Sequence, residues 1–428
     1  MPMAGEMFIM LALFLIIGVP VGFSIGISAG FYLVFFRGMS GTIIIHRVIE
    51  GINSFPLLAV PLFILSGTLM IYGSTPRLIR LANLLLGRLP GGLGAAGCLG
   101  CSFFSAISGS ANATVAAIGS VVGPEMIKQG YDRGFTASMI AATGAMGLVI
   151  PPSVVMVVYS QSAGVSIGRL FLAGIIPGIL CTLFFVALCV FIARRRGYKG
   201  VRVEVRSVWE IVFIVLDAIL PLLMPAIILG GVFSGIFTPT EASSVAVVYS
   251  VLLAKVVYRE VTWRGLVDAL ANSAKTSAML LFIVGLAAPL GWVLVTQRVP
   301  ILMSNAILSA IDNPILIYLA VLLLLVLLGT FMEAFTLVIL TTPIFVPIMM
   351  EIGVDLIAYG IVLTLAVSVG AITPPLSICI FTACRVMKVS VEETFPDVFM
   401  PIAVLIFATV LIAFVPQIAL WLPSMLMP

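Results

Sequence analysis

The sequence predicts an all-α polytopic membrane protein built from two inverted repeats, each with a re-entrant helical hairpin and a Pro-broken transmembrane helix. Hydrophobic residues fill 62% of the 428 positions and charged residues only 9%, and the mean hydropathy is +1.30. A soluble domain does not need that much apolar surface. A Pro-Pro motif interrupts two of the long apolar runs at corresponding places in the two halves.

The duplication is visible in the stretches 144–153 and 368–377. Aligning Pro151 on Pro374 gives an offset of 374 − 151 = 223 residues, which also pairs Gly147 with Gly370. A Pro pair removes two backbone donors, and a helix broken in hydrocarbon needs a cavity or a bound group for its free backbone atoms. One such break is explained equally well by a kink that neighbouring helices solvate. Repetition in both halves favours a paired transport site.

The N-terminal part, residues 1–90, is expected to form scaffold helices and a first arm. Met7 to Phe36 is apolar for about thirty residues, with Gly18 and Pro20 near its middle, so it is one long kinked span or two short pieces, and we favour one span. Asn53 to Tyr72 is the second span. The segment that follows carries basic residues at intervals, at Arg77, Arg80 and Arg88. It is amphipathic and is expected to lie at the membrane interface.

Residues 91–193 are expected to form the transport core of the first repeat. Gly91 to Gly123 is rich in Gly, Ala and Ser, and the polar stretch 104–114 divides it into two short apolar arms, as in a re-entrant hairpin. The alternative is a continuous helix whose small residues allow close packing. Phe135 to Ser160 is the broken helix and Phe171 to Ala193 the next span.

Residues 194–311 are expected to hold a cytoplasmic basic loop, the central scaffold helices and a second arm. The dense basic run from Arg194 to Arg206 assigns that loop to the cytoplasm. The predicted elements that follow are three spans, Val208 to Phe233, Ala242 to Val257 and Ser277 to Val295, and an interfacial arm, Leu302 to Ile311.

Residues 312–428 are expected to form the transport core of the second repeat. Pro314 to Met350 is the second hairpin, broken at 329–336, followed by the broken helix Ala358 to Cys384 and a last span, Phe399 to Trp421. Counting spans from the basic loops makes the hairpins open on opposite sides, the arrangement used for alternating access about a midplane site. The same count leaves Arg37 and Arg47 outside, against the usual bias.

Two hairpin tips that meet two helix breaks would gather carbonyl and hydroxyl oxygens, which are hard ligands suited to Na⁺ and unsuited to transition metals. We predict two Na⁺ sites, largely from backbone oxygens. The first comprises Ser105, Ser108, Gly147, Ile150 and Pro152, and the second comprises Gly329, Gly370, Thr373 and either Pro375 or Leu376.

The other ends of the half-helices expose N–H groups, which attract carboxylates. Neutral hydrogen bonds to such a substrate are predicted from Ser110, Asn112, Thr114, Thr336 and Ser377, although each also fits an ordinary interhelical hydrogen bond. Glu333 stands in an apolar run at the repeat position of Ser110, and a carboxylate there is costly. It is a candidate for proton coupling or for bracing the hairpin tip, and the bland alternative is a structural ion pair.

Other classes of function find little support. His46 is the one histidine, and no reactive pair of the kind an intramembrane enzyme needs is present, so we expect no enzyme activity and no catalytic residue. Cys98-x-x-Cys101 has redox spacing but lies among small apolar residues, which favours packing. Neither tip resembles the selectivity filter of a channel. The composition predicts a lipid environment and no nucleic-acid partner.

Several separate motifs resemble the large membrane subunit of tripartite ATP-independent periplasmic (TRAP) transporters. They are Asn53-Ser-Phe-Pro-x4-Pro-Leu-Phe-Ile64, Ser108-Gly-Ser-Ala-Asn-Ala-Thr114, Gly130-Tyr-Asp-Arg133 and the two Pro-Pro motifs. The resemblance covers nearly the whole chain. It implies an elevator-type transporter in the bacterial inner membrane that imports an organic acid with Na⁺, such as a sialic acid or a C4-dicarboxylate.

The resemblance also implies two protein partners, a small four-helix membrane subunit and a periplasmic substrate-binding protein. Fused members of the family carry the small subunit at the N-terminus, and this sequence lacks it, so the partner is expected as a separate chain. The alternative from the bare pattern is a stand-alone Na⁺- or H⁺-coupled anion carrier of the same inverted-repeat architecture. The two hypotheses differ in one testable respect, since only the tripartite transporter requires a periplasmic receptor.

Overall fold

The computed structural model describes residues 5–200, 207–299, 301–303 and 313–427. In the first half of the chain the helices are α1 (Gly5–Ile16), α2 (Val21–Phe31), α3 (Gly41–Ile52), α4 (Ala59–Leu86), α5 (Gly92–Ser108), α6 (Ala111–Lys128), α7 (Arg133–Gly144), α8 (Val154–Ala163) and α9 (Ile167–Arg196). In the second half they are α10 (Val208–Phe233), α11 (Pro239–Val251), α12 (Trp263–Thr296), α14 (Pro314–Gly329), α15 (Ala334–Glu351), α16 (Leu356–Ile372), α17 (Ile378–Met387), α18 (Phe395–Phe414) and α19 (Gln417–Leu426).

Seven of the described helical segments are long and apolar enough to cross a membrane. They are Phe55–Leu86, Ile167–Arg196, Val208–Phe233, Pro239–Val257, Trp263–Thr296, Ala334–Glu351 and Glu392–Phe414. The shorter apolar helices include α5, α8, α14, α16 and α17. The prediction of an all-α polytopic membrane protein is confirmed.

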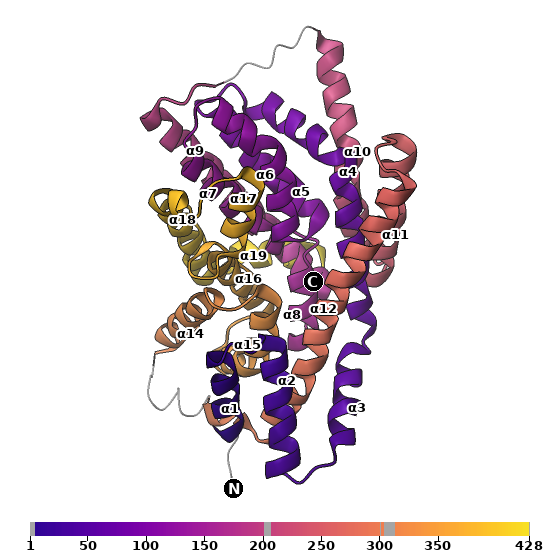
Figure 1. Cartoon of the computed structure of the whole chain (residues 1–428), viewed down its shortest axis with the longest axis vertical. Helices are drawn as coiled ribbons and strands as arrows, with labels where there is room; N and C mark the ends of the chain where they lie inside the picture. The colour runs from indigo at the N-terminus through magenta and orange to yellow at the C-terminus, as the bar shows by residue number, and fades with distance from the viewer. Residues whose placement is uncertain (1–4, 201–206, 300, 304–312, 428) are drawn as a thin grey trace.

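Both predicted hairpins are present. Helix α5 ends at Gly109 in the left-handed region (φ +59°), and α6 begins after Ser110. Helix α14 ends at Thr330, and α15 begins after Glu333. In Figure 1 the first hairpin lies in the upper half of the molecule and the second in the lower half, so they enter from opposite sides. The continuous-helix alternative for residues 91–123 is therefore wrong.

Both predicted helix breaks are also present, and both fall at the Pro-Pro motifs. Helix α7 runs through a 3₁₀ turn (Ala145–Leu148) into an irregular segment before α8 starts at Val154. Helix α16 ends at Ile372, and α17 starts at Ile378. The breaks occur because neither proline of a pair supplies a backbone N–H for the helical ladder.

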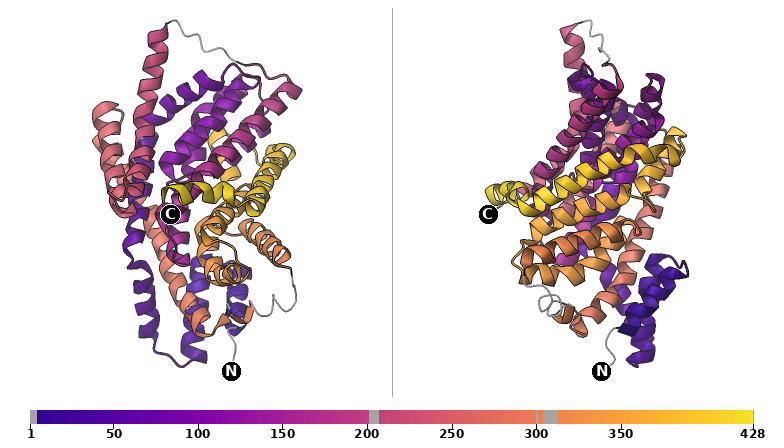
Figure 2. Two further views of the ribbon diagram at one scale, coloured as in Figure 1. Left: turned by 180° about the vertical axis from the view of Figure 1, so that it is seen from behind. Right: turned by 90° about the vertical axis from the view of Figure 1, so that its left-hand side faces the viewer.

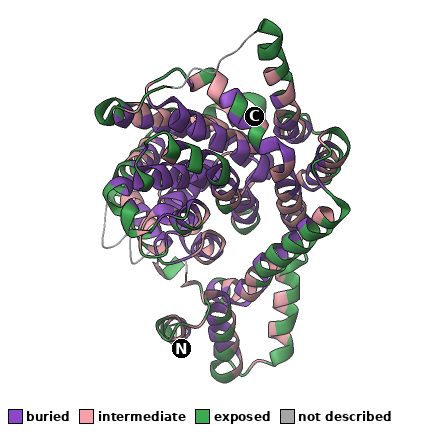
Figure 3. Cartoon of the chain, turned by 45° about the horizontal axis from the view of Figure 1, so that its top comes forward, coloured by how far each residue is buried: buried purple, intermediate pink, exposed green. Residues whose placement is uncertain are grey.

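The helices form two bodies that lie side by side in Figures 1 and 2. One body packs the two hairpins and the two broken helices around each other, together with α9, α18 and α19. The other body contains the long helices α4, α10, α11 and α12, with α2 and α3 against α12. Buried residues are concentrated in the first body, whereas the helices near the N-terminus are exposed over much of their surface (Figure 3).

A close contact between α8 and α16 joins the two repeats. The hydroxyl of Tyr159 donates to the carbonyl of Leu356 at 2.7 Å. Its ring lies directly over Gly360, where an added Cβ would stand only 2.4 Å from a ring carbon. Only glycine fits this crossing, so the second half of one broken helix is held against the first half of the other.

Helix α4 bends at Tyr72 and Gly73, where Gly73 has φ +82°. The basic segment after the bend forms the second part of the same helix, so it is helical as expected, and it leads directly into α5. Arg77 pairs with Asp217 at 3.0 Å and with Glu260 at 2.9 Å, and its guanidinium lies 3.6 Å from the centre of the Tyr258 ring. These contacts hold the bend against α10 and the loop after α11.

Two elements have bounds that differ from those expected, and a third lies almost entirely outside the described residues. The single span expected over Met7 to Phe36 is wrong, because Gly18 (φ +87°) ends α1 and Pro20 stands before the first residue of α2. The last span ends at Phe414 rather than Trp421, because Pro416 cannot continue the ladder and α19 starts afresh. The second arm, Leu302 to Ile311, falls almost entirely outside the described residues.

An ionic cluster ties the ends of both repeats together beside the basic run at 194–196. Arg196 pairs with Asp132 at 2.8 Å and with Asp397, and the hydroxyl of Tyr198 donates to Asp132 at 2.6 Å. Partial burial, followed by the hydrogen bond to Asp132, raises the pKa of Tyr198 above its ordinary value, so the phenol stays a donor. Asp132 belongs to the first repeat and Asp397 to the second, so one guanidinium links the two.

Candidate functional site

The first hairpin tip packs against the first helix break through backbone atoms. An added Cβ on Gly147 would lie 2.6 Å from the carbonyl carbon of Ser110, and one on Gly109 would lie 2.4 Å from the carbonyl oxygen of Pro152. The N–H of Val154 points to the carbonyl of Gly109 at 3.4 Å. The approach of one backbone to the other therefore depends on two glycines.

The residues predicted for the first Na⁺ site surround this contact. The hydroxyls of Ser105 and Ser108 lie 3.4 and 3.0 Å from the hydroxyl of Thr114, which donates to the carbonyl of Ser110 at 2.9 Å. Gly147 and Pro152 touch the tip from the other side, as described above. Ile150 lies in the same break as Pro152, with its side chain packed toward Gly178 of α9. All five residues therefore belong to the first hairpin or to the break that it contacts.

The second hairpin tip repeats this arrangement. An added Cβ on Gly370 would lie 2.4 Å from the carbonyl carbon and 2.5 Å from the carbonyl oxygen of Gly329. The N–H of Leu376 donates to the carbonyl of Thr330 at 3.1 Å. The hydroxyl of Thr373 donates to the carbonyl of Val369 at 2.6 Å. Pro375 lies in the irregular segment between α16 and α17. All five residues predicted for the second Na⁺ site are therefore at one tip and break.

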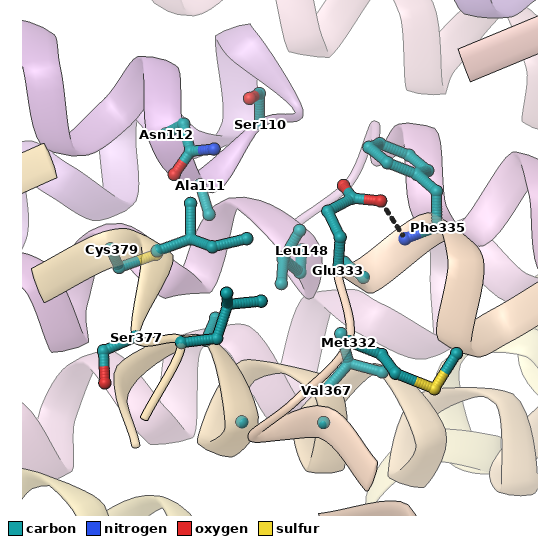
Figure 4. A pocket seen from close by; sticks show the side chains of 16 residues that line it. Ser110, Ala111, Asn112, Leu148, Met332, Glu333, Phe335, Val367, Ser377 and Cys379 are labelled. Carbon is teal, nitrogen blue, oxygen red and sulfur yellow. Dashed lines mark hydrogen bonds between the residues drawn. The ribbon is translucent and has the colours of Figure 1, made fainter. Parts of the chain in front are cut away.

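A small cavity of about 50 Å³ lies between the two tips (Figure 4). Its lining includes Ser110 and Asn112 from the first tip, Glu333 from the second tip and Ser377 at the start of α17. Polypeptide from both hairpins and both helix breaks meets there. The volume is far below the roughly 300 Å³ of an ordinary ligand pocket, so a substrate of more than a few heavy atoms requires the tips to move apart.

Two of the predicted substrate residues are placed elsewhere. Thr114 is fully buried in the hydroxyl cluster with Ser105 and Ser108. Thr336 is buried within the first turn of α15 and does not line the cavity. Ser110, Asn112 and Ser377 remain as the polar side chains that face or border it, together with Glu333.

The family model described as "Tripartite ATP-independent periplasmic transporter, DctM component" matches residues 8–418. The chain belongs to this family. It is therefore a transporter permease subunit and, with its seven long apolar helices, a multi-pass protein of the bacterial inner membrane. The predicted resemblance to the large subunit of TRAP transporters is confirmed.

Individual relatives agree with this assignment. The isethionate TRAP transporter permease protein DctMQ of Oleidesulfovibrio alaskensis is 38% identical over 96% of this chain, and the chain spans 65% of that protein. The C4-dicarboxylate and sialic acid TRAP large permease proteins of Vibrio cholerae, DctM and SiaM, are each 34% identical over at least 98% of this chain and 97% of their own length.

A solved structure has the same fold. The YdaH transporter of Alcanivorax borkumensis, whose crystal structure "reveals an unusual topology", superposes with a TM-score of 0.59 over 87% of this chain and 88% of that one. The two sequences are only 15% identical, so this likeness concerns the fold alone.

The lining of the TRAP subunit's cavity also includes Gly329, Gly370 and Leu376, which were predicted for the second Na⁺ site. The other lining residues were not predicted from the sequence and are mainly apolar or small: Ala111, Leu148, Met332, Ala334, Phe335, Val367, Ala371, Ile378 and Cys379. Val367 and Leu148 lie inside helical turns, where the sequence carries no signal for a lining residue.

Ser377 has an unusual conformation at this cavity. Its backbone lies in the left-handed region, with φ +35° and ψ +50°, which a residue with a Cβ seldom adopts. Its side chain is 3% exposed, and its hydroxyl has no hydrogen-bond partner among the described residues. A buried polar atom without a partner is costly, so Ser377 is a costly residue at the border of the cavity.

Proposed function

We propose that this chain imports an organic acid across the bacterial inner membrane, driven by an inward Na⁺ gradient. A periplasmic binding protein delivers the substrate, and a small four-helix membrane subunit completes the transporter. The proposal draws on the family membership and on relatives named for isethionate, C4-dicarboxylates and sialic acid, all of them organic anions. The name DctMQ of one relative, which is longer than this chain, is in keeping with a second membrane component.

The observation that carries the proposal is the meeting of two hairpin tips with two helix breaks around one cavity. The first tip and its break offer hydroxyl and carbonyl oxygens from Ser105, Ser108 and Pro152, and the second tip and its break offer carbonyl oxygens from Gly329 and Gly370. Neutral oxygen donors at the C-terminal ends of half-helices suit a dehydrated alkali cation. Na⁺ bound at both contacts would hold each tip on its break and shape the cavity for substrate.

The division into two bodies supports an elevator movement. Hairpins and broken helices form one body, and α4 joins it to the long helices of the other through a bend at Gly73. In the proposed cycle the first body carries Na⁺ and substrate past the second, which stays in place. Substrate and ions are then exposed alternately on the two sides of the membrane.

Uptake of labelled organic acids into proteoliposomes tests the proposal. The vesicles hold this chain with its small subunit, and the inward Na⁺ gradient and the binding protein are varied separately. Accumulation that needs both supports the tripartite Na⁺-coupled importer. Uptake with Na⁺ and without the binding protein would instead favour the stand-alone carrier, and receptor-dependent uptake that ignores Na⁺ would point to proton coupling.

A further inference from the structure

A second cavity, of about 300 Å³, lies between the two bodies. On the side of the first body it is lined by α5, α9 and the first helix break, which contributes Ile150 and Pro151. On the side of the second body it is lined by Pro225 and Leu229 of α10. It is larger than the cavity between the hairpin tips, which has about 50 Å³. The cavity is therefore part of the seam between the bodies, and neither body forms it alone.

The lining of this seam cavity is almost entirely apolar. It contains no Lys, Arg, His, Asp or Glu, and all of its residues are among those that the structure describes. Its polar side chains, Ser102 and Thr182, have partners: their hydroxyls lie 2.7 Å apart, and that of Thr182 donates to the carbonyl of Gly178 at 2.7 Å. A water in a cavity needs free polar partners, and these groups are already paired. The cavity is therefore suited to an apolar occupant.

The seam cavity opens at the depth of the hydrocarbon core. Ile179 and Leu183 of α9 stand at its rim and are 56% and 59% exposed. Helix α9 is one of the segments long enough to cross the membrane, and at about 1.5 Å per residue both side chains lie about 18 Å or more from either of its ends. The hydrocarbon core is about 30 Å thick, so lipid tails surround the rim. An acyl chain is the apolar group that reaches the cavity from there.

The same face of α9 leads from the cavity to exposed cations. Arg194 follows Leu183 by 194 − 183 = 11 residues, which is about three turns, so it lies on the same face about 17 Å further along the helix. This length is close to the thickness of one leaflet of the core, about 15 Å. The Arg194 guanidinium is exposed, and none of the described carboxylates pairs with it. Arg195 beside it is exposed too. Guanidinium groups bind phosphate in a bidentate manner, so a phosphate fits one leaflet away from the cavity.

We propose that the seam cavity binds one acyl chain of a membrane phospholipid, whose phosphate lies at Arg194 and Arg195 and whose chain end lies between α5, α9 and α10. This lipid site is separate from the site of the transported acid and goes beyond the proposed function. An apolar cavity that stays empty is destabilising. Closely packed side chains fill one arrangement of two surfaces, whereas a flexible chain can fill the seam in several relative positions of the bodies.

Photolabelling from inside the bilayer tests the site. The chain and its small subunit are placed in nanodiscs that contain phosphatidylglycerol with a diazirine at the end of one acyl chain, and labelled residues are identified by mass spectrometry after illumination. Ser102 and Thr182 are buried, so their labelling requires a chain inside the cavity. Labelling confined to exposed residues such as Leu216 of α10 would show surrounding lipid only and would overturn the proposal. A free fatty acid with the same diazirine is the second probe, and labelling of the two hydroxyls by this probe alone would overturn the phospholipid as occupant.

Variants at both ends of the proposed site complete the test. Ala106→Phe fills the cavity and should lower labelling of Ser102 and Thr182 by about tenfold. Its matched control is Ala278→Phe, at an exposed position of α12 outside the lining.

Replacing Arg194 and Arg195 together with Gln should also lower the labelling by about tenfold, because basic residues near the membrane surface attract anionic headgroups. Arg80→Gln, at an exposed position of α4, is the matched control. Thermal unfolding confirms that each variant is folded, and Leu229→Phe, from the other body, carries the test if Ala106→Phe unfolds. Wild-type labelling in the cavity variant or in the arginine variant would overturn the proposal.

Discussion

Replacing Gly370 with Ala tests the contact between the second hairpin tip and the second helix break. The new Cβ would stand 2.4 Å from the carbonyl carbon of Gly329. Ordinary van der Waals contact begins at 3.4 Å, so the two backbones must separate by 3.4 − 2.4 = 1.0 Å. Because the clash is with backbone, no side-chain rotation relieves it. Overpacking of this kind costs about 1–3 kcal/mol, which corresponds to a 5- to 150-fold loss of affinity for whatever the contact binds.

The assay is Na⁺-driven uptake into proteoliposomes, measured over a range of Na⁺ concentrations. Gly370→Ala should raise the Na⁺ concentration needed for half-maximal uptake by about 5- to 150-fold. Gly147→Ala should have a similar effect, because its Cβ would lie 2.6 Å from the carbonyl carbon of Ser110. Gly291→Ala is the control, since a Cβ there meets nothing within 4 Å. Wild-type Na⁺ dependence in both site variants, with the proteins folded and inserted, would refute the placement of the Na⁺ sites.

Three single contacts give further predictions. Thr373→Ala should shift Na⁺ dependence less than Gly370→Ala, because the Thr373 hydroxyl already donates to a backbone carbonyl; an equal shift in uptake assays would make that hydroxyl a ligand. Arg196→Ala leaves Asp397, whose side chain is 9% exposed, without its cation, and should lower stability by about 1–3 kcal/mol; an unchanged unfolding temperature would contradict this. Gly360→Ala forces a Cβ into the ring of Tyr159 and should also destabilise the fold by about 1–3 kcal/mol. Thermal unfolding beside the open-site control Gly230→Ala measures the loss, and equal unfolding temperatures for the two variants would show that the crossing of α8 and α16 is looser than described.

The duplication explains why so much of the interior could be predicted from the sequence. Both hairpins and both breaks follow from two Pro-Pro motifs and two polar interruptions. Proline leaves backbone groups without helical partners, and few backbone arrangements can satisfy such groups in hydrocarbon. The offset of the repeat alone pairs Glu333 with Ser110, and each residue does stand directly before the second helix of its hairpin. Helix α10 matches its predicted bounds, Val208 to Phe233, because it is one apolar run flanked by polar residues.

The parts that could not be predicted depend on tertiary packing or on a local choice between two outcomes. Gly18 and Pro20 are compatible with a kink and with a full stop, and the structure has the stop. Thr114 and Thr336 share the composition of substrate ligands, yet helix rotation buries both away from the cavity. The apolar lining, such as Val367, depends on which helix faces which tip, and one sequence does not contain that information.

The most direct test of the account is a structure of the chain with its small subunit, determined by electron microscopy once in Na⁺ and once with Na⁺ replaced by a large organic cation. The account predicts two separate densities in Na⁺ alone, one among Ser105, Ser108 and Gly147 and one among Gly329, Gly370 and Thr373. It predicts both hairpin tips closer to their helix breaks in Na⁺. Identical maps in the two conditions, or a cation bound to Glu333 in place of these oxygens, would contradict the account.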